Sequence, residues 1–360
     1  MSFRRLIIPV FYIFCFSIYG QESKTTYIID SLRITYNLPR TDTFSNDTSD
    51  ALDFALNYEF GNEPRCLTYQ AMPASVDSSN ARSWVQNFLT GNIDLSALEP
   101  QIEFYKNSFK YPYCEKELAE FRNFFKWIKK YSKGDFVWVN IPSQELYVFQ
   151  DSKFKYKMNV IVGTYKNQTP IFADYIDNFS LFPYWYPTQN IVFDEIIPKT
   201  IADIGFLERN FYEVLDKKGK MVDPLSLEWE TFKRDKFPYR IRQTTGCFNS
   251  LGLIKFNLKN PFSIYLHDTQ HTQTSRGLFK KSKRYYSHGC IRIEKPKEFL
   301  SFLKPAKPVD PDFMVDCPTD KKPITIPLKE KMPVFVMYFT DFINEKGQLI
   351  SKPDFYKLLH

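Results

Sequence analysis

The sequence has 360 residues, of which 43% are hydrophobic and 25% are charged, and this ordinary globular composition excludes a chain that is disordered throughout. Its 12 glycines are too few for a collagen-like or glycine-rich repeat protein. The net charge of +7 suits an anionic partner such as a polymer that carries carboxylates, and it is too small to indicate nucleic-acid binding.

The first residues, 1–20, have the pattern of a secretory signal peptide. Arg4 and Arg5 form a charged start, residues 6–19 are apolar apart from one serine, and Gly20 offers a cleavage point. The apolar run is shorter than the roughly 20 residues that span a bilayer, so we expect cleavage rather than an uncleaved anchor. We therefore expect an exported protein, periplasmic or in the cell envelope, with no stable membrane span in its mature form.

The next region, residues 21–134, is expected to be a mainly helical scaffold. Residues 21–48 are polar and are interpreted as an extended lead-in. Helices are expected from Ser49 or Asp50 onwards, over 83–89 and over 115–131. The last of these has apolar residues at helical spacing, acids early and lysines late, and Gly134 ends it. No cluster of chemically reactive residues lies here, so a structural role is favoured.

Residues 135–360 have the texture of strands. Strands are expected over 136–141, 146–149, 154–162, 252–257 and 262–266, with a closing hairpin built from 334–339 and a turn at 345–347. Residues 195–236 interrupt them with sequence that looks helical over 204–215 and 224–233. This insertion is either a lid or a helical excursion that only packs. The predicted fold class is α+β, a β-rich domain after a helical region.

A thiol and three histidines gather in one short stretch. Of the four histidines in the chain, His267, His271 and His288 lie close in sequence to Cys290. The thiolate is the reactive form of cysteine, so a nucleophilic Cys290 needs a lowered pKa or an adjacent base. His267 ends a predicted strand, and Gly289 lets N–H groups face an oxyanion. The stretch predicts a cysteine nucleophile, the alternative being a buried structural thiol.

The other cysteines do not form a dense disulfide framework. Cys15 lies in the expected signal peptide, which leaves an odd number after cleavage and therefore at least one thiol that is free or paired between molecules. Cys66, Cys114, Cys247 and Cys317 allow three pairings, and the sequence does not choose among them.

The string Ser-His-Gly-Cys-Ile-Arg at 287–292, preceded by Tyr-Leu-His-Asp-Thr at 265–269, resembles the signature of L,D-transpeptidase catalytic domains. Further segments that resemble the family lie at 139–142, 146–149, 169–170, 183–185, 249–252, 255–256, 333–339 and 341–343, and at Gly347. The resemblance covers roughly 135–357 and includes a preceding helical region, as in the larger exported subtype. In that subtype a substrate-capping subdomain stands where this chain has 195–236.

The resemblance implies a peptidoglycan L,D-transpeptidase, a transferase of cell wall biogenesis and cell shape that needs no cofactor. A cysteine attacks a tetrapeptide stem, D-Ala leaves, and an amine resolves the thioester into a crosslink. The matched residues imply these roles: Cys290 as nucleophile, His267 as base, Ser287, His288 and Gly289 as loop and oxyanion support, and Arg292 and Tyr265 as substrate-binding residues. Carbapenem-type inhibitors are expected to acylate the thiol.

Other functions remain open at this point. A zinc peptidase or amidase would use His267 and His271 with His288 or Cys290, although the intervening sequence is poor for a helix and contains no glutamate. The same cysteine site acting with water would make an L,D-carboxypeptidase, and a wall-binding protein without catalysis is a third alternative. His271 is a rival base, and His267 is favoured because the family-like residues frame it. The acceptor amine, the protein partners and the oligomeric state are not predicted.

Overall fold

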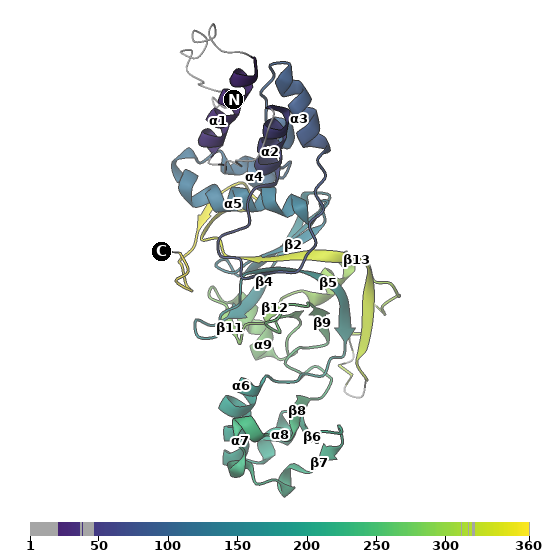
Figure 1. Ribbon diagram of the computed structural model, residues 1–360. Helices are drawn as coiled ribbons and strands as arrows, with labels where there is room; N and C mark the ends of the chain where they lie inside the picture. The colour runs from purple at the N-terminus through teal and green to yellow at the C-terminus, as the bar shows by residue number, and fades with distance from the viewer. Residues whose placement is uncertain are drawn as a thin grey trace. The chain divides into compact units, whose positions relative to one another are not determined.

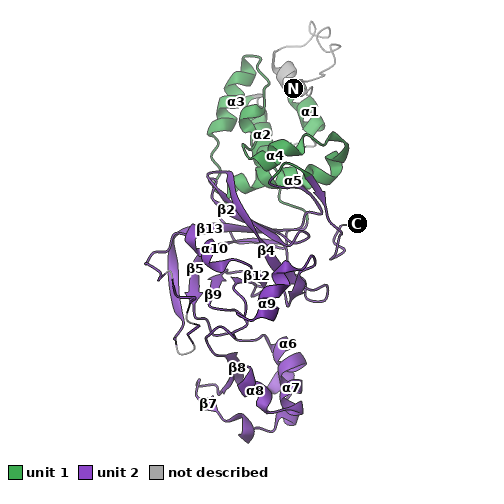
Figure 2. Cartoon of the chain, turned by 180° about the vertical axis from the view of Figure 1, so that it is seen from behind, with its two compact units in different colours: residues 1–65, 74–131, 346–348 green, residues 66–73, 132–345, 349–360 purple. Residues whose placement is uncertain are grey.

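The computed structural model describes residues 21–36, 38, 47–310, 312–315, 317–318 and 321–359. The expected signal peptide, residues 1–20, lies outside them. The chain divides into two compact units, shown in Figure 2. The helical unit comprises Met1–Arg65, Ala74–Tyr131 and Lys346–Gln348, and the β unit comprises Cys66–Pro73, Ser132–Glu345 and Leu349–His360.

The helical unit is built from five α-helices in the described residues: α1 (Gln21–Tyr36), α2 (Asp47–Phe60), α3 (Ser79–Leu89), α4 (Glu103–Ser108) and α5 (Glu115–Trp127). The expected extended lead-in over 21–48 is wrong, because α1 occupies most of it. Ile29 and Leu32 of α1 are buried in the core of the unit. Arg33 is only 3% exposed and pairs with Asp50 and Asp53 of α2 at 2.7 and 2.9 Å. These contacts with α2 stabilise a helix that polar sequence alone did not predict.

One large sheet dominates the β unit. Its strands in the described residues are β1 (Tyr69–Gln70), β2 (Phe136–Asn140), β3 (Glu145–Gln150), β4 (Lys153–Gly163), β5 (Phe172–Leu181), β9 (Ile254–Asn257), β10 (Leu266–His267), β11 (Tyr285–Ser287), β12 (Ile291–Ile293) and β13 (Ile324–Met337). The order is β1-β5-β13-β2-β3-β4-β12-β10-β9, and β5 also pairs with β9. The path therefore returns on itself and leaves the sheet closed around its core (Figure 1).

Aromatic pairs across neighbouring strands fill this core. Phe136 stacks on Phe149 with ring centroids 4.4 Å apart, and Trp138 stacks on Tyr147 at 4.6 Å, each pair lying directly opposite in the β2–β3 register. Helix α10 (Pro296–Phe302) packs on the sheet through a ring contact with β9. Large stacked rings bury much apolar area and so fix the register of the strands that carry the site.

Two expected strands differ from those observed. The run 262–266 forms a strand only at its end, because the Asn260 side chain accepts hydrogen bonds from the N–H groups of Phe262 and Ile264 and bends the chain there. The run 334–339 joins the large sheet in β13, so the closing hairpin is formed by β14 (Asp341–Ile343) and β15 (Leu349–Ser351) instead.

The insertion, residues 195–236, was expected to be helical over 204–215 and 224–233, and it is helical only in part. In residues 189–243, which contain the insertion and its two flanks, the short helices are α6 (Gln189–Ile191), α7 (Ile197–Ala202) and α8 (Gly205–Arg209), with a π-helical turn at Val192–Ile196. They are followed by a small sheet of β7 (Met221–Val222), β6 (Tyr212–Leu215) and β8 (Arg240–Gln243). Phe211 has φ +60° and ends the helix, and β6 then pairs with β8. An apolar cluster that includes Leu207, Val214 and Trp229 gives the insertion a core of its own, in the lower part of Figure 1.

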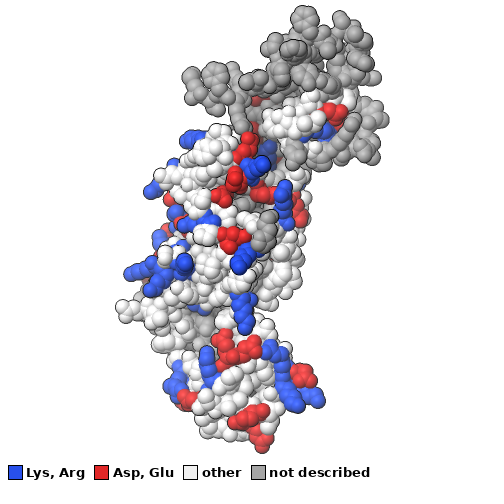
Figure 3. All heavy atoms as spheres, turned by 90° about the vertical axis from the view of Figure 1, so that its left-hand side faces the viewer, with Lys and Arg blue, Asp and Glu red and all other residues white. Residues whose placement is uncertain are grey.

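Two surface features bear on the expected partners. No helix among the described residues is long and apolar enough to cross a membrane. On the face in Figure 3, Lys and Arg side chains are interspersed with Asp and Glu.

Candidate active site

Three adjacent strands place three polar side chains in one row. His267 of β10 lies opposite Lys255 of β9 and opposite Arg292 of β12 in the register of the sheet. Residues that pair directly across neighbouring strands point to the same face. Ile291 N–H donates to the carbonyl of Tyr265 at 2.9 Å, which sets the preceding residue, Cys290, beside the start of β10. The sheet thus brings the predicted thiol, base and arginine together.

The loop before Cys290 is a tight turn that hydrogen bonds hold in shape. Ser287 Oγ donates to the carbonyl of Cys290 at 2.6 Å and accepts from Gly289 N–H at 3.1 Å. Gly289 has φ +114°, a conformation that favours glycine, and its carbonyl accepts from Thr169 Oγ1 at 2.7 Å. Ser287 and Gly289 therefore shape the loop. The N–H of Gly289 is engaged by Ser287 and is not free for an oxyanion in this state.

Cys290 is a free thiol at the edge of this loop. Its Sγ donates to the carbonyl of Ser263 at 3.6 Å. Burial raises the pKa of the Cys290 thiol, while a backbone hydrogen bond from Tyr265 and the charges of Lys255 and Arg292 act to lower it. Because burial is the larger effect, the resting side chain is the thiol, and it needs a base to become a nucleophile.

His267 has the proton arrangement that such a base needs. Its ring is 3% exposed, and Nδ1 lies 2.5 Å from the carbonyl oxygen of Asp268. A carbonyl only accepts, so we assign the hydrogen to Nδ1, which leaves Nε2 with a lone pair. Burial and the nearby charge of Arg292 lower the pKa of His267 to about 3, so the ring is neutral at pH 7.

Two cations flank the histidine without a carboxylate partner. Burial lowers the pKa values of both Lys255 and Arg292, and the charge of a Cys290 thiolate would raise both. In the part of the chain that the structure describes, neither forms an ion pair. Lys255 Nζ lies 3.6 Å from the ring centre of Tyr265. Lys255 was not predicted as a site residue, because pairing with His267 is visible only in the folded sheet.

The other two predicted histidines have different partners. His288 Nε2 lies 2.5 Å from Oε1 of Glu195, so the loop that carries Cys290 contacts the insertion. His271 Nε2 lies 2.7 Å from Oδ2 of Asp268. The described residues contain no group of three or more His, Cys, Asp or Glu side chains that could hold a metal ion. The histidines of the zinc alternative therefore do not form a ligand set there.

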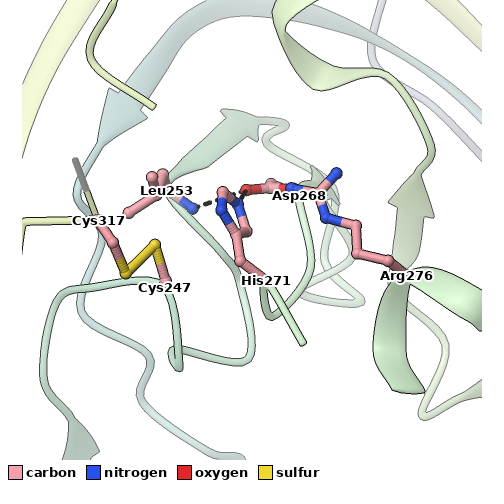
Figure 4. Close-up of a disulfide and its surroundings, with 6 residues drawn as sticks. All are labelled: Cys247, Leu253, Asp268, His271, Arg276 and Cys317. Atoms are coloured by element: carbon pink, nitrogen blue, oxygen red, sulfur yellow. Dashed lines mark hydrogen bonds and ion pairs between the residues drawn. A yellow bond between two sulfur atoms is a disulfide. The ribbon is translucent and has the colours of Figure 1, made fainter. Parts of the chain in front are cut away.

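One of the open disulfide pairings is present. Cys247 and Cys317 are joined, which ties the loop after β8 to a segment 70 residues later. Figure 4 shows this disulfide near Leu253, Asp268 and His271.

Comparison of the sequence with known protein families finds one catalytic domain family. Residues 134–310 match the family model described as the L,D-transpeptidase catalytic domain. Residues 134–310 therefore belong to the L,D-transpeptidase catalytic domain family. The expected fold class, a β-rich domain of this family with a mainly helical region before it, is confirmed.

Individual relatives show how far the likeness extends. A Haemophilus influenzae strain Rd protein named "Putative L,D-transpeptidase" is 35% identical over 220 residues. The match covers 61% of this chain and 44% of that protein, so the chain spans less than half of its length.

Two solved structures are also similar. The catalytic domain of the E. faecium L,D-transpeptidase acylated by ertapenem is 11% identical, with a TM-score of 0.28, over 57% of this chain and 99% of that one. An L,D-transpeptidase from Mycobacterium smegmatis is 12% identical, with a TM-score of 0.25, over 57% of this chain and 59% of that one.

A substitution at Gly252 would show how closely the residues around Asp268 are packed. It has φ +62°, and an added Cβ would lie 2.3 Å from Oδ2 of Asp268. We expect Gly252→Ala to lower the melting temperature by several degrees, at about 2–4 °C per kcal/mol for a unit of this size. Gly219→Ala is the matched control, because Gly219 has φ +81° but its added Cβ would meet nothing closer than 3.9 Å. Equal losses in the two variants would mean that Asp268 has room to move.

Proposed function

We propose that this chain is an exported peptidoglycan L,D-transpeptidase with Cys290 as nucleophile and His267 as base. The observation that carries the proposal is the row of Lys255, His267 and Arg292 across three paired strands, next to a free thiol. The family of the catalytic domain supports the reaction class. The Cys247–Cys317 disulfide supports export, because disulfides persist in oxidising compartments.

In the first half of the reaction, His267 Nε2 takes the proton of the Cys290 thiol as Sγ attacks the carbonyl carbon before the terminal D-Ala of a tetrapeptide stem. The C–N bond breaks, and the imidazolium returns the proton to the leaving D-Ala amine. In the second half, an acceptor amine attacks the thioester and gives its extra proton to His267. The thiol then leaves, protonated again, and the new amide is the crosslink.

Lys255 and Arg292 supply the charge that this substrate requires. A stem peptide carries carboxylates, and two partly buried cations that pair with no carboxylate of the described residues are suited to bind one of them. Lys255 and Arg292 also lower the pKa of His267. A carboxylate bound between them would offset that effect, so substrate binding would raise the basicity of His267.

The insertion is proposed as a lid over stem peptides. Support comes from the contact between Glu195 and His288, which joins it to the loop two residues before Cys290. Its own apolar core allows it to move as a body. Trp185 and Gln243 exchange backbone hydrogen bonds of 2.8 and 3.2 Å at its base, so the two chains that connect it are adjacent.

Cys290→Ala should abolish transfer, with a loss of several orders of magnitude, because no other group in the site replaces the thiol. The measurement is mass spectrometry of muropeptides after incubation with a tetrapeptide substrate. A carbapenem should add its mass to the wild type and not to this variant. Cys66→Ala controls for the loss of a cysteine elsewhere. Activity above about a tenth of wild type in Cys290→Ala would contradict the assignment.

Lys255→Met and Arg292→Met should each reduce kcat/KM on a stem peptide by about 10–100-fold, the value of a charge-assisted hydrogen bond. The measurement is a cycle in which each variant and the wild type act on the peptide and on versions amidated at one carboxylate. The amide should cost the wild type much and the variant little. Lys259→Met is the control, because this exposed lysine pairs with Asp177 instead. Equal amide penalties in variant and wild type would refute carboxylate binding.

Replacing residues 187–241 by a short Gly-Ser linker should raise KM for stem peptides by tenfold or more and leave alkylation of Cys290 by iodoacetamide unchanged or faster. A stem peptide needs positioning contacts, whereas a small reagent needs only an accessible thiolate. Glu195→Ala, which removes the contact to His288 alone, should show the same change in smaller degree. A folded deletion variant with wild-type kinetics on peptide would dismiss the lid.

A further inference from the structure

The C-terminal segment, residues 354–359, places a buried hydroxyl against the end of β4. The side chain of Tyr356 is 2% exposed. Its Oη donates to the carbonyl of Gly163, the last residue of β4, at 2.7 Å and accepts from the N–H of Thr169 at 3.2 Å. Burial raises the pKa of Tyr356 to about 12, so the hydroxyl keeps its proton and remains a donor at neutral pH.

Thr169 links Tyr356 to the loop that carries Cys290. Its side chain is 1% exposed. Oγ1 accepts from the N–H of Gly163 at 2.9 Å and donates to the carbonyl of Gly289 at 2.7 Å. Because a hydroxyl has a single hydrogen, the N–H of Gly163 leaves that hydrogen for the carbonyl of Gly289. Three hydrogen bonds therefore connect the C-terminal segment, the end of β4 and the residue before the thiol.

The carbonyl of Gly289 belongs to the peptide group whose N–H is that of Cys290. A trans peptide group is planar, and its C=O and N–H point in opposite directions. All described peptide bonds are trans, so the N–H of Cys290 points away from Thr169, which holds the carbonyl. No acceptor among the described residues takes this N–H. It is available to an oxyanion on the carbon that Sγ attacks, as the N–H of the nucleophile is in serine proteases.

The C-terminal segment is itself held in place. The N–H of Tyr356 donates to Oη of Tyr338 at 2.8 Å, and that hydroxyl donates to Oδ1 of Asp354 at 2.8 Å. The carboxylate of Asp354 also accepts from two N–H groups near the end of the segment, at 3.0 and 2.9 Å. Phe355 stacks on Tyr285 of β11 with ring centroids 3.8 Å apart. These contacts fix the position from which the hydroxyl of Tyr356 acts.

We propose that Tyr356 is a positioning residue of the active site, which acts through Thr169 to hold the peptide group between Gly289 and Cys290. The C-terminal segment is then needed for catalysis as well as for the fold. The inference rests on the proposed function for its kinetic consequence, while the arrangement of the loop does not need a substrate. A role in stability alone would lower the melting temperature and leave the kinetics of the folded enzyme unchanged.

The test uses substitutions that remove a hydroxyl and keep the shape of the side chain. Tyr356→Phe removes Oη, Thr169→Val removes Oγ1, and Thr169→Ser keeps the hydroxyl. Tyr147→Phe is the matched control, since it removes another buried hydroxyl of the same unit, which donates to Oε2 of Glu145 at 2.6 Å. Tyr356→Phe and Tyr147→Phe should each lower the melting temperature by a few degrees, because each loses a buried hydrogen bond.

Only the variants of the hydrogen-bonded chain should lose turnover. We expect kcat of Thr169→Val on a tetrapeptide stem to fall about 10–100-fold with KM nearly unchanged, because a displaced oxyanion donor weakens binding of the transition state alone. Thr169→Ser and Tyr147→Phe should keep most of the activity. Tyr356→Phe should lose up to about tenfold, since it acts through Thr169. The double variant should be no slower than Thr169→Val, because both changes break the same chain.

Two measurements separate this role from a general disturbance of the site. Alkylation of Cys290 by iodoacetamide forms no oxyanion, so its rate should be nearly unchanged in every variant. Hydrogen exchange at the amides of Gly289 and Ile291, which are hydrogen-bonded, follows the loop without a substrate. Exchange should be faster in Tyr356→Phe and Thr169→Val and normal in Thr169→Ser, because release of the Gly289 carbonyl lets the loop open more often.

Other outcomes would overturn the proposal. Unchanged kcat and exchange in a folded Thr169→Val variant would show that the loop does not depend on these hydroxyls. A loss of alkylation as large as the loss of kcat would mean that the thiol, and not the peptide group, has moved. Additive losses in the double variant would refute a shared chain.

Two further results keep the test decisive. If Tyr356→Phe does not fold, Tyr338→Phe, which releases the N–H of Tyr356, carries the same comparison. A wild type without transfer activity, in which loop exchange still responds to Tyr356→Phe, would refute the proposed function and leave this inference standing.

Discussion

The site depends on the pairing of one very short strand. β10 consists of Leu266 and His267, and it pairs with β9 on one side and β12 on the other. These two ladders alone decide which side chains flank His267. A shift of one residue in either register would turn the neighbouring cation to the opposite face. The stacked aromatic rings of β2 and β3 and the closed path of the sheet restrict such a shift, so the core stabilises the site as well as the fold.

The charges and burial of Lys255, His267 and Arg292 favour an unreactive Cys290 thiol when no substrate is bound. Burial keeps Cys290 as a thiol, and burial with two adjacent cations keeps His267 neutral. A permanent thiolate–imidazolium pair would be more reactive towards oxidants, since thiolate character governs oxidation. In the proposed mechanism the carboxylates of the stem peptide offset the cations, so the proton transfer becomes favourable when the substrate is bound. Selectivity and activation then come from the same two side chains.

Periodicity in the sequence predicted the elements that carry it strongly. The helix expected over 115–131 is present as α5 with a 3-10 turn at Ile128–Lys130, and the strand expected over 154–162 is present as β4. Both have apolar residues at the spacing of their element. Helix α1 was missed, since its stability comes from Arg33 and its acidic partners in α2, which no local pattern reveals. The sheet of the insertion was missed for a similar reason: β6 pairs over its full length only with β8, more than twenty residues later, and β7 adds two residue pairs on its other side.

The site was predictable where the motif is contiguous and not where it is assembled. The string 287–292 and the framed His267 pointed to residues that the sheet does bring together. Lys255 lies in a segment that resembles the family, 255–256, but the sequence did not show that it lies beside His267. That position follows from the antiparallel pairing of β9 and β10. Thr169, which fixes Gly289, is 120 residues away from it and gave no sign of that contact.

The sequence left two candidate bases, His267 and His271, because both precede Cys290 in the same stretch of chain. From the sequence alone, either His267 or His271 could face the thiol of Cys290. In the structure, Nε2 of His271 is instead engaged by the buried carboxylate of Asp268. One imidazole meets the backbone carbonyl of Asp268 and the other meets its side chain. A single residue thus binds both histidines, one through each of its polar ends. Asp268 is also tied to β9 and its neighbour, because its N–H donates to the carbonyl of Ile254 and its Oδ2 accepts from the N–H of Leu253. The proposed base therefore stays at the end of β10, whatever path the chain takes from there to Cys290.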